Sequence, residues 1–556
     1  MPSRPAYGPG TPAELFAAVL DTEPGLPALV EDGQVQTFGD WWHASALAAS
    51  GLADLGVGSG DVVALLLPSG TGFATCCLGA LRLGAVVSGV NPRLGPTEIG
   101  HIIARARPAV IVTDTPGQVP PGTDVPVRTP GRLIGEPGAT PSVDGFAAPP
   151  PGAPAVIVWT TGTTGLPKGA WFDHESLAFM AQNLGPLSAP YDRKLMPVPF
   201  AHAGYLTRVY DQLIHRSALV LTPAVWSAES MLEVLVRERV TVGQGVPTQW
   251  EKLIALDGLA DADLSCLRLV ATGASRVPAS LVTAMRERLG CPVVVRYAST
   301  ELPLAFGTGI ADPAETVATT VGRPLGDVQA EIRSAAGDRL EAGETGRLFL
   351  RSRGVMRGYW RDPERTAQTL RPDGWLVTSD LGSLDAAGNL TIVGRADDAY
   401  IRGGYNVHPS EVEAALLAHP RVSRATVVGT PAPVIGEIGV AFVVPADAPA
   451  DVLTDASADV RAGVPAAPGT DPVGGAAVTA EDLRAWCRER IADYKVPDLV
   501  VFLDDLPVNA TYKVDVARLR AIAAETAARG PRADRPRSQP PGPRLRAGTP
   551  PAAGAQ

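Results

Sequence analysis

A run of hydroxyl and glycine residues follows directly after an apolar segment of the chain. The run reads Thr160-Thr-Gly-Thr-Thr-Gly-Leu-Pro-Lys168-Gly169, and the preceding Pro154-Ala-Val-Ile-Val158 is typical of a buried strand. Glycines let backbone N–H groups approach an anion, threonines add hydroxyl donors, and Lys168 adds a positive charge. A Walker A loop would end in Gly-Lys-Ser/Thr, which this run lacks. The pattern therefore predicts a phosphate-binding loop of a different type.

Four further segments that combine polar side chains with glycines or aromatic residues follow in order. They are Arg296-Tyr297-Ala298-Ser299-Thr300-Glu301, then Trp375-Leu-Val-Thr378-Ser379-Asp380, then Gly394-Arg395-Ala-Asp397-Asp398 with Gly403-Gly404 and Pro409-Ser-Glu411, and finally Leu506-Pro-Val-Asn509-Ala-Thr-Tyr512-Lys513-Val. Together with the first loop, these segments resemble the ordered motifs of the adenylate-forming superfamily, which includes acyl-CoA synthetases, luciferases and the adenylation domains of peptide synthetases. The resemblance covers about residues 12 to 522.

The chain departs from the superfamily pattern at a few positions. Trp159 and Thr161 differ mildly from it, whereas Ser379 and Tyr512 each stand where a glycine is usual. Neither of these two replaces a reacting group, but both are expected to change the local backbone or the mouth of a substrate channel.

The resemblance implies a ligase reaction in two steps. An acid oxygen attacks the α-phosphorus of ATP and pyrophosphate leaves, and the acyl group of the adenylate then passes to the thiol of coenzyme A. Such catalysis depends on neutralising charge and aligning the reacting groups.

The resemblance also assigns residues to the phosphates and to the metal. The residues that would cradle the β and γ phosphates are Thr160, Thr161, Gly162, Thr163, Thr164 and Lys168. Thr300 would contact the α-phosphate, and Glu301, with Thr160, would bind Mg²⁺, which prefers oxygen ligands.

The nucleoside would be held by three later segments. By resemblance, Tyr297 stacks on adenine and Gly273-Ala274-Ser275 forms the opposite wall. Asp380 accepts hydrogen bonds from both ribose hydroxyls, and Arg395 reaches the ribose or a phosphate. Taken alone, Tyr297 would be read as a half-buried strand aromatic and Asp380 as a turn residue.

Lys513 is the first catalytic candidate. The resembling segment places it over the carboxylate and the α-phosphate during adenylation. A rotation of the C-terminal part about Asp397 would then carry Lys513 away and bring Gly403 and Gly404 towards the pantetheine path of coenzyme A.

The acid pocket is predicted less sharply. Positions that resemble its lining are His202, which we also count as catalytic, Tyr205, Arg208, Gln244-Gly-Val-Pro-Thr248 and Trp250. This mixture of bulky and polar side chains favours a short, branched, cyclic or aromatic acid over a long fatty acid. Each of these residues could equally face the core.

Two alternatives to an acid–CoA ligase stay open. The acceptor could be a carrier-protein thiol or an amine, or the enzyme could activate nitrite to diazotise an arylamine. A non-catalytic nucleotide-binding protein is disfavoured because Lys513, Glu301 and Asp380 are all present.

The elements that must position these residues follow an α/β pattern. Residues 61–68, 84–90 and 109–113 read as buried strands, and residues 72–83 and 96–104 read as helices between them, which predicts βαβ units with a parallel sheet. Shorter strands after about residue 325 predict a small β-rich subdomain. We expect a large N-terminal domain over residues 1–395 and a small, mobile α+β cap over residues 396–522.

Two segments are expected to lie outside these domains. The stretch near 445–480 reads as a loop insertion because it is rich in Ala, Pro, Asp and Gly. Residues 523–556 read as a disordered Pro/Arg-rich tail.

Composition agrees with a large globular enzyme. A chain of 556 residues with 45% hydrophobic content predicts two or more domains, and the net charge of -10 argues against nucleic acid as a partner. The five cysteines form neither a metal spacing nor a disulfide framework. The N-terminus lacks the apolar core of a secretory signal, and no stretch is long and apolar enough for membrane insertion, so a cytoplasmic location is expected.

Overall fold

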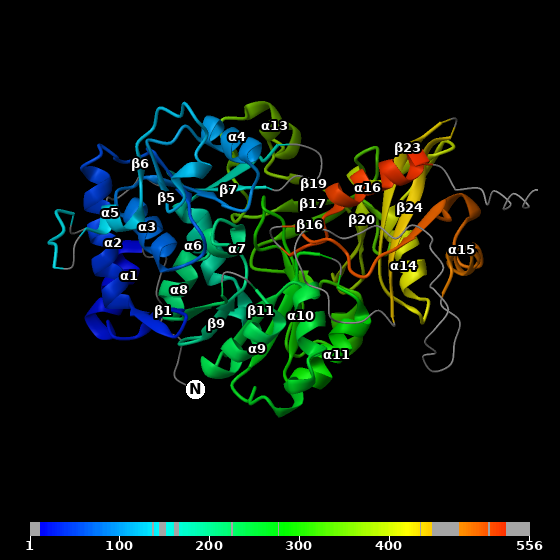
Figure 1. Ribbon diagram of the computed structural model, residues 1–556, viewed down its shortest axis with the longest axis horizontal. Helices are drawn as coiled ribbons and strands as arrows, with labels where there is room; N and C mark the ends of the chain where they lie inside the picture. The colour runs from blue at the N-terminus through cyan, green and yellow to red at the C-terminus, as the bar shows by residue number, and fades with distance from the viewer. Residues whose placement is uncertain are drawn as a thin grey trace, which may run out of the picture.

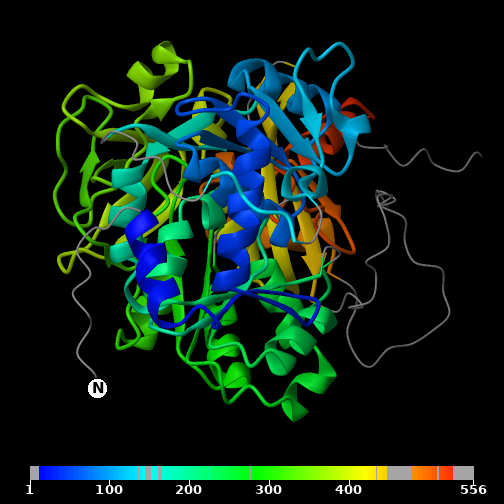
Figure 2. The same ribbon diagram turned by 90° about the vertical axis from the view of Figure 1, so that its left-hand side faces the viewer.

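The structure is a computed structural model that describes residues 12–135, 138–143, 152–160, 166–223, 226–275, 277–433, 435–446, 478–509 and 512–529. A large α/β body fills most of the molecule, and a smaller α+β unit built from the last part of the chain lies against it (Figure 1 and Figure 2). This arrangement confirms the predicted fold class.

The first sheet of the body has seven strands and ends next to the predicted phosphate loop. In order across the sheet, the strands are β18 (Gly358–Tyr359), β8 (Gly169–Asp173), β7 (Pro154–Trp159), β4 (Val86–Val90), β3 (Val62–Leu66), β5 (Val110–Thr113) and β6 (Val127–Arg128). Strands β7, β4, β3, β5 and β6 pair in parallel. Strands β3, β4 and β5 consist of buried residues throughout, as expected for a sheet covered on both faces.

The second sheet of the body has nine strands. Their order is β15 (Arg323–Pro324), β14 (Phe306–Gly307), β13 (Val293–Tyr297), β12 (Leu269–Gly273), β11 (Val242–Gly245), β9 (Arg193–Met196), β10 (Ala218–Leu221), β1 (Pro27–Glu31) and β2 (Gln34–Thr37). Strands β13, β12, β11, β9, β10 and β1 are parallel, and the remaining edge strands are antiparallel.

Helices cover both sheets of the body. They are α1 (Pro12–Thr22), α2 (Phe38–Ala53), α3 (Thr71–Arg82), α4 (Pro96–Ala106), α5 (Pro130–Ile134), α6 (His174–Gln182), α7 (Ala203–Leu206), α8 (Val209–His215), α9 (Ala228–Arg237), α10 (Pro247–Ile254), α11 (Ala279–Leu289), α12 (Ala314–Thr319) and α13 (Pro363–Thr369), with 3-10 turns η1 (Pro116–Gln118), η2 (Gly185–Leu187) and η3 (Asp257–Asp261). Helices α9, α10 and α11 pack on one face of the nine-stranded sheet (Figure 1). A shared core that includes residues of α2, α3, α6 and α8 joins the two sheets.

The predicted β-rich subdomain is an antiparallel sheet of four strands. These are β16 (Gln329–Arg333), β17 (Gly346–Arg351), β19 (Leu376–Leu384) and β20 (Leu390–Arg395). The chain leaves β20 through the 3-10 turn η4 (Ala396–Asp398) and enters the small unit, which we call the cap. The boundary predicted after Arg395 falls at this passage.

In its described residues, the cap contains a five-stranded sheet and three helices. Its elements are β21 (Tyr400–Arg402), β22 (Tyr405–Val407), β23 (Val422–Ala432), β24 (Gly436–Pro445), β25 (Leu499–Phe502), α14 (Pro409–Leu417), α15 (Ala480–Arg488), α16 (Val516–Arg529) and the 3-10 turn η5 (Asp493–Lys495). Most of the predicted insertion, residues 447–477, lies outside the described residues.

The predicted start of the disordered tail, at residue 523, lies too early in the chain. Helix α16 continues to Arg529, and Ala523 is fully buried in the cap. It packs in one cluster with Leu519, Val428 and Phe442, so this part of the segment does find apolar surface to cover. Residues 530–556 lie outside the described residues. Among the described helices, none has the length and apolarity needed to cross a bilayer.

Candidate active site

The carboxyl ends of three parallel strands bring separate motifs to one edge of the nine-stranded sheet. Gly245 of β11 lies opposite Thr272 of β12, and Gly273 lies opposite Arg296 of β13. A Cβ atom at Gly273 would lie 2.2 Å from the carbonyl oxygen of Arg296, so no side chain fits there. The predicted wall Gly273-Ala274-Ser275 therefore leaves the sheet directly beside Tyr297.

The residues predicted to bind the nucleoside meet at this edge. Tyr297 donates a hydrogen bond to Oδ2 of Asp380 at 2.5 Å, and Nη1 of Arg395 lies 3.6 Å from Oδ1. Asp380 and Arg395 are directly paired across β19 and β20. Burial raises the pKa of Asp380, although the hydroxyl of Tyr297 and the charge of Arg395 oppose that shift. A carboxylate, a phenol ring and a guanidinium thus occupy one site.

The base of the predicted phosphate loop is closed by two hydrogen bonds. Thr160 N donates to the carbonyl oxygen of Lys168 at 2.9 Å, and Lys168 N donates to Oγ1 of Thr160 at 3.2 Å. The strand that leads into the loop is fixed by Trp159, whose indole nitrogen donates to Ser88. Thr161, Gly162, Thr163 and Thr164 lie outside the described residues, and their roles stay predictions.

Lys168 and Glu301 are joined through a tyrosine from a distant strand. The Lys168 ammonium lies 5.0 Å from the centre of the Tyr359 ring, and the Tyr359 hydroxyl donates to Oε1 of Glu301 at 2.6 Å. Thr300 precedes Glu301 in the loop after β13. The predicted phosphate lysine and the predicted metal carboxylate therefore lie at the same end of the site.

The cap delivers Lys513 to this site from a short loop. Asn509 N donates to the carbonyl oxygen of Lys513 at 2.7 Å, and Lys513 N donates to Oδ1 of Asn509 at 3.2 Å. Burial and, after it, the charge of Arg395 lower the pKa of Lys513. No described residue accepts a hydrogen bond from the Lys513 ammonium. A cation held in this way favours an anionic ligand.

Several contacts hold the cap against the body. Thr248 donates to the carbonyl oxygen of Tyr512 at 2.8 Å, and the Tyr512 ring packs 5.6 Å from that of Trp226. Lys252 pairs with Asp505 of the cap at 3.1 Å. Thr248 belongs to the segment predicted to line the acid pocket, and the structure shows that it also receives the loop before Lys513.

His202 lies near two cationic groups of the site, Lys513 and Arg208. Burial, followed by the charges of Lys513 and Arg208, lowers the pKa of His202 to about 4. The imidazole is therefore neutral near pH 7. Because Lys513 comes from the cap and Arg208 from the body, His202 marks the joint at which the two parts meet.

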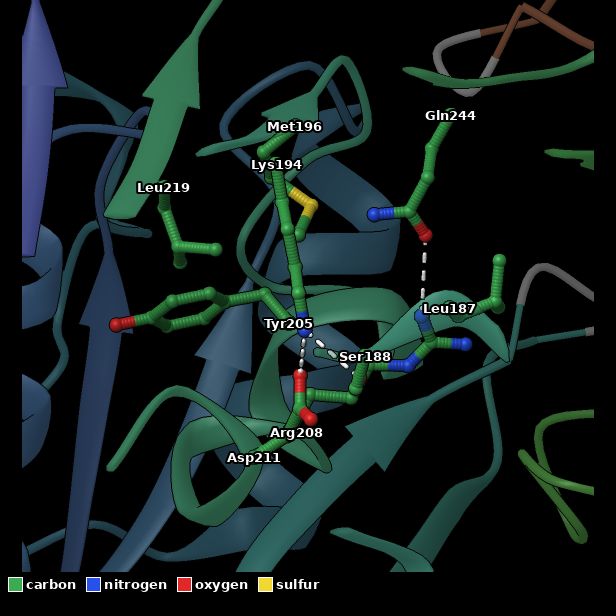
Figure 3. Close-up of a pocket in the computed structure, with 9 residues that line it drawn as sticks. All are labelled: Leu187, Ser188, Lys194, Met196, Tyr205, Arg208, Asp211, Leu219 and Gln244. Carbon is green, nitrogen blue, oxygen red and sulfur yellow. Dashed lines mark hydrogen bonds and ion pairs between the residues drawn. The ribbon is translucent and has the colours of Figure 1, made fainter. Parts of the chain in front are cut away.

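A small cavity beside Arg208 contains a buried network of charged residues (Figure 3). Its lining comprises Leu187, Ser188, Lys194, Met196, Tyr205, Arg208, Asp211, Leu219 and Gln244. Lys194 donates to Asp211 at 2.6 Å and to Ser188 at 2.7 Å, with 3% and 5% of the Lys194 and Asp211 side chains exposed. Arg208 donates from Nη1 to Oε1 of Gln244 at 3.1 Å.

Two residues assigned to the acid pocket belong instead to the core. Trp250 is fully buried beneath β11 and β12, where its indole nitrogen donates to the carbonyl oxygen of Ala271 at 3.1 Å. Gly243 leaves room for its ring, since a Cβ atom there would lie 2.9 Å from Trp250. Tyr205 is fully buried and stacks on Phe200 with ring centres 3.7 Å apart, so it forms only the floor of the cavity.

The glycine pair of the cap lies at the surface. Gly403 and Gly404 connect β21 to β22 with φ values of +57° and +86°, which suits a tight hairpin turn. The flanking Ile401 and Tyr405 are 53% and 57% exposed. No described contact brings this hairpin to the site around Lys513, so its role towards coenzyme A stays a prediction.

Known proteins share both parts of this architecture. The family described as AMP-binding enzyme matches residues 16–360, and its C-terminal domain matches residues 411–513. The chain belongs to the AMP-binding enzyme family.

Individual relatives of this AMP-binding enzyme extend over nearly its whole length. A feruloyl-CoA synthase from an Amycolatopsis species is 31% identical over 501 residues, which span 88% of this chain and 94% of the relative. The ATP-bound structure of MatB from Rhodopseudomonas palustris superposes with a TM-score of 0.78 at 25% identity, covering 93% of this chain and 99% of MatB. The amide bond synthetase McbA from Marinactinospora thermotolerans superposes with a TM-score of 0.76 at 30% identity, covering 92% and 100%.

Sequence reasoning missed several residues of the site in this AMP-binding enzyme. Tyr359 and Lys194 carry no motif, because each acts through a partner that is distant in sequence. Arg296 was noted only as a neighbour of Tyr297. The signal that could have singled it out is a charged residue at the end of an otherwise apolar strand, Val293-Val-Val295.

We expect the substitution Lys194→Met to lower the free energy of unfolding by about 3–5 kcal/mol, because it leaves Asp211 buried without its ammonium partner. Urea titration of the wild-type protein and the variant measures this difference in the free energy of unfolding. The matched control is Arg237→Met, which breaks an exposed ion pair with Glu233 and should cost no more than about 1 kcal/mol. Equal losses in the two variants would contradict the assignment of Lys194 and Asp211 as a buried pair.

The low pKa of His202 predicts a specific loss of stability in acid. The unfolded chain takes up a proton near pH 6.5, whereas folded His202 does so only near pH 4. The unfolded state therefore binds more protons between these values, and stability falls as pH drops from 6.5 to 4. The variant His202→Gln should lack this part of the decline when unfolding is measured at several pH values. If the free energy of unfolding depended on pH in the same way in both proteins, the neutral state of His202 would be refuted.

Proposed function

We propose that this protein is an AMP-forming acid–CoA ligase. The observation that carries the proposal is that Lys513, a cap lysine whose ammonium has no hydrogen-bond acceptor among the described residues, meets Arg395 and His202 beside the Tyr297–Asp380 pair. A carboxylic acid and the α-phosphate of ATP are anions that such a group would align and neutralise. The feruloyl-CoA synthase among its relatives supports coenzyme A as the acceptor.

In the first step, the residues of the chain bind and orient the two substrates. Tyr297 offers its ring to adenine, and Asp380 accepts hydrogen bonds from the ribose hydroxyls. Lys513 stabilises the negative charge that develops when the acid oxygen bonds to the α-phosphorus and pyrophosphate leaves. His202, neutral at pH 7, forms the wall next to the reacting carboxylate.

The residues at the phosphate end fit ATP and a magnesium ion. Lys168 supplies a positive charge for the β and γ phosphates, and Oε2 of Glu301 is the oxygen of that carboxylate that does not accept from Tyr359. No group of three acidic, histidine or cysteine side chains in the described part of the chain forms a metal cage. A single carboxylate suits Mg²⁺, which takes its other ligands from phosphate and water. When bound, the metal would neutralise phosphate charge.

In the second step, a thiol attacks the acyl adenylate and AMP leaves. We propose that the cap turns about Asp397 between the steps, so that the exposed hairpin at Gly403 and Gly404 approaches the pantetheine arm. The C-terminal family match over residues 411–513 supports a cap of the kind that AMP-binding enzymes carry.

A second candidate function uses an amine as the acceptor. The 30% identity to an amide bond synthetase over almost the full chain favours it. The two functions differ in a measurable product. Release of AMP that depends on coenzyme A, with formation of a thioester, supports the ligase, whereas turnover with an amine in the absence of coenzyme A supports amide synthesis.

We expect Lys513→Ala to lower the rate of ATP–pyrophosphate exchange by about 100-fold or more across a panel of carboxylic acids, because it removes the charge that stabilises the transition state. Lys495→Ala, which removes another cap lysine that pairs with Glu411, serves as the control and should keep the wild-type rate. Production of ADP and orthophosphate by the wild-type protein would overturn the proposed chemistry.

A further inference from the structure

The cavity beside Arg208 holds more positive charge than its carboxylates balance. Asp211 is the one described carboxylate that stabilises the charge of Arg208, but it is already paired with Lys194 and lies 3.0 Å from Nδ1 of His215. Nη1 of Arg208 donates to Gln244, and its Nε and Nη2 donate to no other described residue. The guanidinium is therefore oriented by a neutral amide and keeps donors available.

Arg296 adds a second cation, and no carboxylate in the described part of the chain forms an ion pair with it. Its Nε and Nη1 are buried without a hydrogen-bond partner, and Nη2 reaches only the carbonyl oxygen of Leu184 at 3.5 Å. Burial and the nearby charge of Arg208 lower the pKa of Arg296 to about 10. Two neighbouring guanidinium groups with unused donors are costly in a protein interior unless an anion binds between or beside them.

We propose that the acid activated by this enzyme carries a second anionic group, a carboxylate or a sulfonate, which Arg208 binds. Arg296 strengthens the positive potential behind it. The reacting carboxylate lies at the Lys513 side of His202, and the second anion lies at the Arg208 side. Such a substrate would neutralise the positive charge near Lys513 and the positive charge near Arg208, which a monoanionic acid cannot do. This inference rests on the proposed adenylation.

The test is ATP–pyrophosphate exchange with matched acids, namely succinate against butanoate, 3-sulfopropanoate against butanoate, and benzene-1,3-dicarboxylate against benzoate. We expect kcat/KM to favour at least one doubly charged acid by about 30-fold or more, since truncating a buried charge pair has effects of this size. Arg208→Met should lower kcat/KM far more for the doubly charged acid than for its singly charged partner and so abolish that preference, whereas Arg208→Lys should retain part of it. The exposed Arg128→Met is the matched control.

The outcomes separate this inference from the proposed function. If the wild-type enzyme activates the singly charged acids as well as their doubly charged partners, adenylation stands and the anion site is wrong. If Arg208→Met weakens both members of a pair equally, Arg208 is only structural. If no acid supports exchange, the proposed function fails and the inference fails with it. If Arg208→Met does not fold, the wild-type ratio of kcat/KM between the doubly and the singly charged acid decides whether the anion site exists.

A second inference comes from separate observations on Ser379 and Tyr512, which stand where the superfamily usually has glycine. The Ser379 hydroxyl donates to Oδ2 of Asp397, in the turn that connects body and cap. The Tyr512 hydroxyl accepts from Nη1 of Arg93 at 3.1 Å, and its ring packs on Trp226. Both substitutions therefore create contacts across or at the joint, where glycine would create none.

The backbone of Tyr512 supports the same conclusion. Its φ of +60° lies in the left-handed region, which glycine adopts freely and tyrosine adopts only at a cost. Such a conformation persists where surrounding contacts over-determine it. The bonds to Thr248 and Arg93, together with the Trp226 contact, are those contacts, and all three lie on the body.

We infer that Ser379 and Tyr512 are positioning residues that hold the cap in the orientation that presents Lys513 to the acid. They lower the free energy of this orientation relative to any rotated one. The reaction should then be biased towards formation of the adenylate, with release of the cap slowing the second step.

The test compares the two half-reactions in Ser379→Gly and Tyr512→Gly. We expect pyrophosphate release to slow by about 5- to 10-fold, in keeping with the loss of one or two modest contacts, while acyl transfer from purified adenylate to coenzyme A stays equal or becomes faster. Tyr191→Gly is a matched control, because Tyr191 is an exposed tyrosine with φ of +64° whose hydroxyl donates to Glu23 of the body.

A distance measurement makes this test independent of the chemistry. Nitroxide labels at Asp54→Cys on the body and Glu489→Cys on the cap should give one dominant distance in the parent protein and a broader distribution in Tyr512→Gly. Equal slowing of both half-reactions with an unchanged distance distribution would show that the two residues support the fold without directing the cap. Absence of both half-reactions in the parent would instead refute the proposed function.

Discussion

The constraint on which the site depends is the crowding of positive groups at the joint between body and cap. Burial and, after it, the charge of Arg395 lower the pKa of Lys513, and burial followed by the charges of Lys513 and Arg208 lowers that of His202. Like charges in a partly buried place repel one another, so this arrangement is unfavourable until anions enter. The chain as a whole carries a net charge of -10, and its positive potential is therefore local. Affinity for phosphate and carboxylate follows from this local excess.

The fold creates the excess by joining segments that are distant in sequence. Parallel strands of one sheet end side by side, so Gln244, Gly273 and Tyr297 reach the same edge. The loop before Lys513 then enters from another domain. Close approach between these segments relies on positions such as Gly273, where a side chain would collide with Arg296. Strands thus carry the groups of the body, and a loop carries Lys513, which the proposed rotation of the cap would move.

The contacts that dock the cap are individually weak. Lys252 and Asp505 are each about a quarter exposed, and exposed ion pairs contribute little because water competes for both charges. Such an interface can be broken without unfolding either part, as the proposed rotation of the cap requires. Among the ion pairs of the described residues, Lys194 and Asp211 form the most deeply buried one, and both residues belong to the body. The strongest buried ion pair therefore stabilises the body, whereas weaker contacts hold the interface with the cap.

The sequence by itself determined the fold class, the order of the motifs and the chemical types at the nucleotide site. Apolar periodicity identified β3, α3 and β4, and the motif at Tyr297 and the one at Asp380 both carry residues that the structure brings together. These features are local in sequence, so spacing and composition reveal them. Composition failed to predict the last turns of helix α16, because their burial depends on strands far away in the chain.

Only the tertiary structure decided which of the predicted pocket side chains pack in the core and which keep unused donors beside a cavity. Trp250 and Arg208 were equally plausible pocket residues, yet one packs beneath a glycine of β11 and the other retains unused donors beside a cavity. The same holds for Tyr512, whose contacts come from three separate segments of the body. The direction in which a side chain points and the residue that it contacts depend on packing between distant segments, which no local sequence pattern encodes.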